Sequence, residues 1–248
     1  LNYIFRRIID TDTDCDAFIV FDADNLLDKN YIREMNQEYN KGSRVITSYR
    51  NSKNYGSNWI SAGSGLWFIR ESKYLNNARA MLNTSAAVSG TGFLVKRELI
   101  ESQEGWKHFL LTEDIEFTID RIIRGEKISY CPGAIFYDEQ PVTFSQSWDQ
   151  RLRWARGFYQ VLGKYGISLL RGMVVGRSFA CFDMLMFIFP ATILTMLSLI
   201  IYMTKSFYLV FFTDPASSQV QDIIPLVMNF GFLYLFLYTL GIITTITE

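Results

Sequence analysis

Two long uncharged stretches near the C-terminus constrain the fold of this chain most. Phe179–Met203 is 25 residues long with one charge, Asp183, and Ile223–Ile246 is 24 residues long with none. A helix needs roughly 20 apolar residues to cross the hydrocarbon core of a bilayer, and the prolines at 190 and 225 are tolerated in such helices. The pattern predicts two transmembrane helices, at about 179–203 and 223–246. A pair of buried core helices is the alternative.

The remainder of the chain has the composition of a soluble domain. All but five of the 49 charged residues lie in residues 1–178. Over the whole chain 24 Lys and Arg balance 25 Asp and Glu, so we expect no nucleic-acid partner. A content of 16% aromatic residues excludes a disordered chain. The three cysteines lack metal-ligand spacing and fit a reducing compartment such as the cytosol.

Flanking charges predict how the apolar stretches are oriented. Basic residues precede the first stretch, whereas Lys205 is the only basic residue in the loop after it, beside Asp214 and Asp222. The positive-inside rule then places residues 1–178 on the cytoplasmic side of the cell membrane, with membrane lipid as a partner. We expect a soluble domain at 1–165, a connector at 166–178 that lies along the membrane surface or simply links the parts, and a multi-pass membrane region at 179–248.

Alternating patterns in the first 165 residues predict an α/β fold. The apolar run Ala17–Phe21 suits a buried parallel strand. A helix is expected behind Thr112 as its cap, and another from Ser147, where Gln150 would complete a capping box. Further expected elements are strands at Ser43–Tyr49, Phe93–Val95, Lys127–Cys131 and Ala134–Tyr137, and helices at Asn30–Tyr39 and before Leu82.

Asp22 and Asp24 directly follow the apolar run Ala17–Phe21. Ligands of open α/β sheets bind beyond the carboxyl ends of strands. Paired carboxylates there suit Mg²⁺ or Mn²⁺ bridging a diphosphate, because these cations prefer oxygen ligands. A strand-to-helix turn without a ligand is the alternative.

Glu113 and Asp114 lie where the helix after Thr112 is expected to begin. Acids at this place complement the positive end of a helix dipole, but a single carboxylate also suits a general base. Burial or a neighbouring carboxylate would raise its pKa and the dipole would lower it. The local sequence leaves both interpretations open.

Gln150, Arg153 and Trp154 are spaced to share one face of a helix. A guanidinium binds phosphate oxygens, and an indole stacks on the apolar face of a sugar. This face therefore suits a sugar phosphate. The alternative is a structural helix, with Trp154 in the core and Gln150 used for capping. The single histidine, His108, is expected to be structural.

Four motifs in one order carry more information than any of them alone. They are Asp22-Ala23-Asp24, Ser89-Gly90-Thr91-Gly92, Thr112-Glu113-Asp114 and Gln150-Arg151-Leu152-Arg153-Trp154, followed by the apolar stretches. In this respect nearly the whole chain resembles the family 2 glycosyltransferases, in the membrane-bound branch that contains the synthases of cellulose, chitin and hyaluronan.

The resemblance implies a GT-A fold and an inverting transfer of a hexose from a nucleotide-diphosphate sugar, such as a UDP-sugar, to a glycan or lipid acceptor in polysaccharide synthesis. It implies that Asp22 and Asp24 bind Mg²⁺ or Mn²⁺ and the donor diphosphate, and that Asp114 is the catalytic base. Gln150 and Arg153 would also contact the donor. The acceptor side would be formed by Trp154, Gly90, Thr91, Gly92 and Glu113. The family's N-terminal strand for the nucleotide base has no counterpart here, as expected for a truncated domain that opens mid-pattern at Leu1.

Other classes of protein fit the sequence less well. A transporter would need ionisable residues within the membrane stretches, and only Asp183 is available. An inactive glycan-binding relative would be expected to lack a motif acid, and none is lacking. Processive polymer synthesis and single transfer to a lipid or short glycan both stay open.

Overall fold

The computed structural model describes residues 1–11 and 15–189, together with single residues and pairs between 198 and 247. The chain divides into two compact units, Leu1–Ile188 and Phe189–Glu248. The elements described below belong to the first unit.

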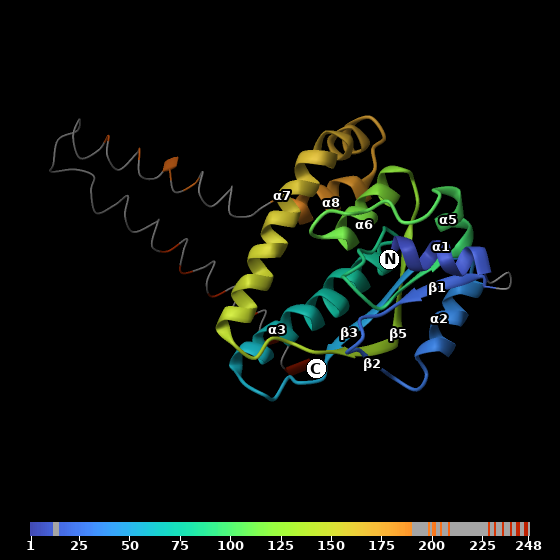
Figure 1. The fold of residues 1–248 in the computed structure, drawn as a ribbon. Helices are drawn as coiled ribbons and strands as arrows, with labels where there is room; N and C mark the ends of the chain where they lie inside the picture. Colours follow the sequence, from blue (N-terminus) through green and yellow to red (C-terminus); the bar gives the residue numbers. More distant parts are fainter. Residues whose placement is uncertain are drawn as a thin grey trace. The chain divides into compact units, whose positions relative to one another are not determined.

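A five-stranded mixed sheet forms the centre of this unit (Figure 1). In the described sheet β3 and β5 are parallel, and the other neighbouring strands are antiparallel. The α/β class is therefore confirmed. In spatial order the strands are β1 (Ala17–Val20), β4 (Phe93–Lys96), β3 (Val45–Ser52), β5 (Ile128–Asp138) and β2 (Leu26–Leu27).

The prediction of a parallel strand at Ala17–Phe21 is wrong, because β1 pairs antiparallel with β4 at one edge of the sheet. The apolar run has another cause. Phe18 packs into the core on one face of the sheet, while Ala17 and Ile19 pack on the opposite face. A continuous apolar run reports burial on two faces and carries no information on strand direction.

Strand β5 replaces the two short strands expected at Lys127–Cys131 and Ala134–Tyr137. Its pairing with β3 shifts register between Ser48 and Tyr49. The shift accommodates Pro132, which cannot donate to the ladder, without ending the strand. The uninterrupted strand ends at Asp138.

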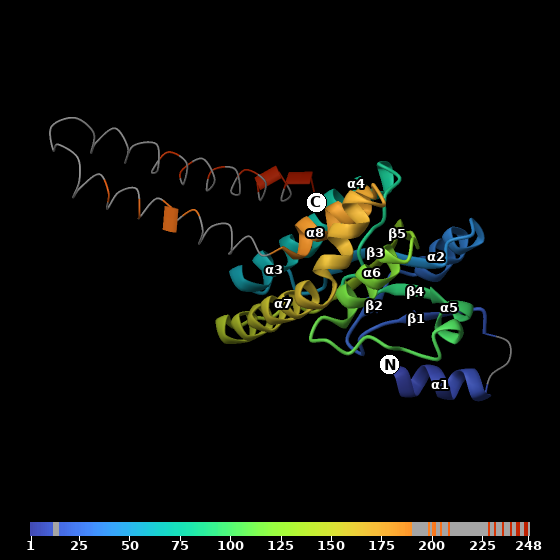
Figure 2. The same cartoon turned by 90° about the horizontal axis from the view of Figure 1, so that it is seen from above.

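Helices cover both faces of the sheet (Figures 1 and 2). One face is covered through Phe5, Leu99 and Phe117, and the other through Tyr31 and Met35. The helices concerned are α1 (Asn2–Thr11), α5 (Arg97–Ser102) and α6 (Glu113–Ile123) on the first face, and α2 (Tyr31–Asn40) on the second.

A second apolar core lies between α6, α7 (Phe144–Val174) and α8 (Phe179–Ile188). Helix α7 begins before the expected Ser147, because Thr143 is its cap: Thr143 Oγ1 accepts from the Gln146 backbone N–H, and Gln146 Oε1 accepts from that of Thr143. The prediction that Gln150 completes the capping box is thus wrong. Residues 166–174 of the expected connector form the last turns of α7. The expected division into a soluble domain, a connector and a membrane region remains a prediction.

The start of α6 also differs from the prediction. Helix α6 begins at Glu113, but the Thr112 side chain does not cap it. The Thr112 side chain is buried, and its hydroxyl has no hydrogen-bond partner among the described residues. A Cβ at Gly157 of α7 would overlap the Thr112 side chain, so Thr112 serves as the contact where the two helices approach closely.

A continuous helical segment connects β3 with the loop before β4. It consists of α3 (Trp59–Arg70), a six-residue π-helix, η1 (Glu71–Asn76), and α4 (Asn77–Met81). Asn58 caps α3 in a capping box with Ser61. The π-helix forms the first half of the helix expected before Leu82, and α4 forms the second half.

Among the residues that the structure describes, no helix is both long enough and apolar enough to cross a membrane. Helix α8 contains the first ten residues of the first apolar stretch, and there Cys181, Met184 and Leu185 pack into the core with α6 and α7. Asp183 accepts from Arg79 Nε at 2.6 Å. Most of both predicted spans lies outside the described residues.

Candidate active site

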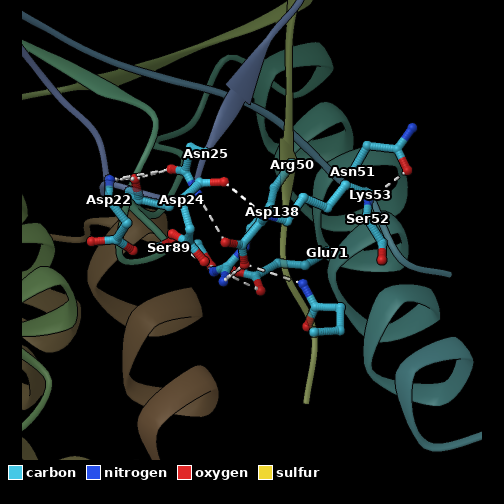
Figure 3. Close-up of polar contacts among 12 residues, drawn as sticks. Asp22, Asp24, Asn25, Arg50, Asn51, Ser52, Lys53, Glu71, Ser89 and Asp138 are labelled. Carbon is cyan, nitrogen blue, oxygen red and sulfur yellow. Dashed lines mark hydrogen bonds and ion pairs between the residues drawn. The ribbon is translucent and has the colours of Figure 1, made fainter. Parts of the chain in front are cut away.

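Three carboxylates, those of Asp22, Asp24 and Asp138, meet at the end of the sheet where β1 and β5 finish. This group is called the acidic edge below. Asp22 and Asp24 follow β1 and are exposed, whereas Asp138 ends β5 and is buried. One oxygen atom of each lies within 4.8 Å of the others, and Figure 3 shows the three side chains side by side. An all-oxygen set of this kind fits Mg²⁺ or Mn²⁺.

Electrostatics at this edge also favour a cation. The pKa of Asp22 is raised, first by the partial desolvation of its carboxylate and then by the charges of Asp138, Asp24 and Glu113, while Arg50 acts in the opposite direction. Carboxylates that repel one another gain most from a bound positive ion.

A chain of hydrogen bonds fixes the loop that carries Asp22. The Asp22 backbone N–H donates to Thr91 Oγ1 at 2.9 Å, and the Thr91 hydroxyl donates to Asn25 Oδ1 at 2.6 Å. The Asn25 amide in turn donates to Asp138 Oδ1 at 2.9 Å. Thr91, expected on the acceptor side, therefore holds the acidic loop in place.

Arg50 of β3 connects the acidic edge with the rest of the site. Its Nε and Nη2 both donate to Asp138 Oδ2, with the Nε bond at 3.0 Å. Its Nη1 donates to the Ser89 carbonyl at 3.0 Å. The guanidinium carbon lies 3.5 Å from the centre of the Phe68 ring, an arrangement that stabilises a cation.

Asp114 lies in the first turn of α6 and is half-buried. Burial raises its pKa to about 6, and the charges of Glu113 and Glu71 act in the same direction. Hydrogen bonds from the backbone N–H groups of Ile115 and Gly90 lower the pKa, but less than burial raises it. The helix terminus therefore does not set the pKa of this group, which lies close to neutral pH as a general base requires.

Two glycines let the loop before β4 approach these groups. Gly90 and Gly92 have φ angles of +77° and +68°, which side chains rarely adopt. A Cβ at Gly90 would lie 3.7 Å from Arg50 Nη1 and 3.9 Å from Asp114 Oδ2, and one at Gly92 would overlap the Phe136 ring. Glycine at 90 thus keeps the space between Arg50 and Asp114 open.

Phe68 links Arg50 to the face of α7 that was expected to bind a sugar phosphate. Trp154 of α7 is half-buried and contacts the Phe68 ring edge-to-face, with ring centres 5.7 Å apart. Phe68 also carries the guanidinium of Arg50. Gln150 is half-buried and Arg153 is exposed. Trp154 is thus the member of this motif with a described contact to the remainder of the site.

The structure adds Arg50, Asn25, Asp138 and Glu71 to the residues singled out from the sequence. Asp138 had a usable signal, because it follows an expected strand in the same way as Asp22 does. Arg50 and Glu71 had none, since both are placed by contacts between distant segments. His108 is buried and packs edge-on against Trp106 at 5.1 Å between ring centres, which agrees with a structural role.

The described site combines an acidic edge, a half-buried carboxylate of raised pKa and a glycine loop between them. Comparison with known proteins gives the class of enzyme to which this site belongs. Residues 17–215 match the model of the glycosyl transferase family group 2, so the chain belongs to this family and is a glycosyltransferase.

Two curated relatives illustrate the range of the family. The probable glycosyltransferase YdaM of Bacillus subtilis (strain 168) is 30% identical over 190 residues, which cover 70% of this chain and 41% of YdaM. The poly-beta-1,6-N-acetyl-D-glucosamine synthase of Staphylococcus aureus (strain COL) is 29% identical over 154 residues, which cover 59% of this chain and 36% of the synthase. The aligned part of this chain thus spans about two fifths of the length of these relatives.

Proposed function

We propose that this glycosyltransferase is an inverting enzyme that moves a hexose from a nucleotide-diphosphate sugar, with UDP as the expected nucleotide, to a glycan or lipid acceptor in polysaccharide synthesis. The observation that carries this proposal is the position of Asp114. Its carboxylate is half-buried, has a pKa of about 6, and lies across Gly90 from Arg50. It is one base facing a site for phosphate and cation.

The chemistry of a single displacement needs only one base. Asp114 takes the proton of an acceptor hydroxyl as that oxygen attacks the anomeric carbon. The bond between this carbon and the diphosphate oxygen breaks on the opposite face, and the configuration inverts. With a pKa of about 6, Asp114 is ionised at neutral pH and is a stronger base than an ordinary aspartate. A retaining enzyme would instead need a second carboxylate as nucleophile.

The donor side is assigned to the acidic edge and to α7. Asp22 and Asp24 would hold Mg²⁺ or Mn²⁺ together with the diphosphate, and Asp138 lies close enough to take part. The bound cation would supply positive charge to the leaving diphosphate. Arg153 is exposed and is assigned to the phosphate oxygens, with Gln150 beside it.

The acceptor side is assigned to Trp154 and to the exposed Gly90, with Glu113 at its border. Thr91 and Gly92 are buried and shape the loop that carries Gly90. Trp154 rests its ring against Phe68 and is only partly buried, so it offers a surface on which a sugar can stack. Gly90 and Gly92, which both have positive φ angles, add no side chain that would block the acceptor.

The membrane setting is part of the proposal. We infer helices across the cell membrane at about 179–203 and 223–246 and a cytoplasmic catalytic domain, on the strength of the uncharged stretches and the flanking basic residues. One of the relatives is named as a synthase of a polysaccharide, which supports polymer synthesis over transfer of a single sugar.

A transfer assay on the full-length protein in membranes tests the function. A panel of labelled UDP-sugars is offered with Mg²⁺ or Mn²⁺, and the products are sized. Asp114→Asn should reduce turnover by roughly 10²–10⁴, the range for loss of a general base, with donor affinity retained. Glu113→Gln is the comparison, since it removes the adjacent carboxylate but not the base, and it should lower turnover far less than Asp114→Asn does. Undiminished turnover of Asp114→Asn would contradict its role as the base. Full activity in excess chelator would contradict the assignment of a cation to Asp22 and Asp24.

A further inference from the structure

Glu71 is a buried carboxylate to which the reaction above gives no role. Glu71 is only 7% exposed, and its carboxylate accepts a hydrogen bond from the Ser89 hydroxyl at 3.3 Å. Figure 3 shows Glu71 beside Arg50 and Ser89. A buried carboxylate is costly unless it is paired or hydrogen-bonded, so its presence at the site calls for an explanation.

The π-helix explains how Glu71 reaches this position. Three of its side chains face the same way: Glu71 binds Ser89, Ser72 Oγ accepts from the Arg50 backbone N–H at 3.0 Å, and Asn76 exchanges two hydrogen bonds of 3.0 Å with the backbone of Ala87. In an α-helix residues 71 and 76 would point about 140° apart. The i→i+5 bonding of a π-helix brings them onto one face, and such turns are frequent at functional sites.

The loop held by this face contacts both halves of the site. The Ser89 carbonyl accepts from Arg50, the Gly90 backbone N–H binds the Asp114 carboxylate, and Thr91 Oγ1 accepts from the Asp22 backbone. A side chain that fixes Ser89 therefore fixes the donor of one of the two backbone hydrogen bonds to Asp114.

We propose that Glu71 is a positioning residue for Asp114, which it serves by holding the Ser89–Gly90 turn against that carboxylate and by placing a second negative charge nearby. This inference rests on the assignment of Asp114 as the base. The charged groups that act on Asp114 are Glu113 on its own helix and Glu71 from η1, and Arg50 lies on the other side of Gly90. Burial raises the pKa of Glu71 itself, and the charges of Arg50 and Arg79 act against this effect. Once Glu71 is ionised, negative charge from two elements makes the Asp114 carboxylate a stronger base.

The test compares three variants of the full-length protein in membranes. Glu71→Gln keeps the size of the side chain and the acceptor for Ser89 but removes the charge. It should lower kcat by about 3- to 30-fold, less than loss of the base itself, leave the donor KM within about twofold, and move the acid limb of the kcat profile to lower pH. Ser89→Ala keeps the charge, so it should lower kcat without moving that limb. Glu101→Gln, on α5 and paired with Arg97, is the control and should change neither.

A second readout does not depend on sugar transfer. Melting temperatures of Glu71→Gln, Asp114→Asn and the double variant are compared between pH 4 and pH 8. Because removing either charge relieves the same repulsion, the two effects should be less than additive at pH 8 and additive at pH 4.

The outcomes separate the two hypotheses. If the effects of the two substitutions on the melting temperature are not additive at pH 8 but the protein transfers no sugar, the link between Glu71 and Asp114 is supported and the proposed function is rejected. If Asp114→Asn abolishes transfer, but the two effects on the melting temperature are additive and Glu71→Gln has a normal pH profile, only the inference about Glu71 fails. A lowered melting temperature with unchanged kcat would likewise reduce Glu71 to a structural residue.

Discussion

The guanidinium of Arg50 binds the carboxylate of Asp138 through both Nε and Nη2, at a point where Asp138 also approaches Asp22 and Asp24. The side chains of Arg50 and Asp138 retain only 12% and 6% of their surface. One ion pair thus joins β3 to β5 and borders the acidic edge. It balances the charge of Asp138, while Asp22 and Asp24 are the exposed carboxylates of the acidic edge.

Loss of this pair should be costly, since it leaves a buried charge without its partner. We expect Arg50→Gln to lower the free energy of unfolding by about 3–5 kcal/mol. The matched control is Arg33→Gln, whose pair with Glu34 is made by a side chain that is 63% exposed; such pairs contribute roughly 0–1 kcal/mol. Urea unfolding of both variants measures the difference. Equal losses would show that the Arg50 pair is energetically ordinary.

Asp114→Asn should make the protein more stable at alkaline pH. The pKa of Asp114 is about 6 in the folded chain against an ordinary value of 3.8. A group with a raised folded pKa supports folding fully below about pH 4, and this support is lost as the pH rises through about 6. The variant should therefore gain up to about 3 kcal/mol at pH 8 and little at pH 4. Thermal melts across this range would contradict the assignment if the gain were the same at both ends.

Gly92 should tolerate no side chain. A Cβ there would overlap the Phe136 ring, and the φ angle of +68° adds strain. Gly92→Ala is expected to destabilise the protein by about 2–4 kcal/mol. At Gly163 of α7 an added Cβ would meet nothing within 4 Å, so Gly163→Ala should stabilise by roughly 0.5–1 kcal/mol. Melting temperatures that shift in the same direction would reject this account.

Much of the site was predictable because its residues lie at the ends of regular elements. Asp22 and Asp24 follow β1, Gly92 precedes β4, and Asp114 lies in the first turn of α6. Local patterns locate such ends well, and the order of the motifs pointed to the family. The direction of β1 was not predictable, because an apolar run reports burial on both faces and nothing about the neighbouring strand.

Residues placed by distant contacts escaped prediction. Glu71 reaches the site through a π-helix, which no periodicity reveals, and Arg50 is defined by Asp138, 88 positions along the chain. Asp183 shows the same limit. It is the single charge in an apolar stretch that predicts a span, yet it pairs with the buried Arg79 of α4. Ion pairs between segments far apart in sequence cannot be read from either segment alone.

Trp154 should affect acceptor use more than stability. Its ring contacts Phe68 edge-to-face and is only partly buried, so its remaining surface is assigned to the acceptor sugar. Loss of one stacking contact of this kind costs about 0.5–1.5 kcal/mol beyond the area buried, or roughly 2- to 12-fold in acceptor KM. We therefore expect Trp154→Ala to raise the acceptor KM by at least that factor and to leave the donor KM unchanged.

A second tryptophan on the same helix provides the control for this prediction. Trp148 is 57% exposed and stacks on Phe144 at 6.1 Å between ring centres, and it lies about 120° around the helix from Trp154. Trp148→Ala removes an indole of the same size from α7 and should leave both KM values unchanged. Initial rates at varied acceptor and donor, with a melting curve for each variant, complete the comparison. If Trp154→Ala lowers the melting temperature while acceptor kinetics stay normal, the indole belongs to the core between α3 and α7 and the acceptor must be bound elsewhere.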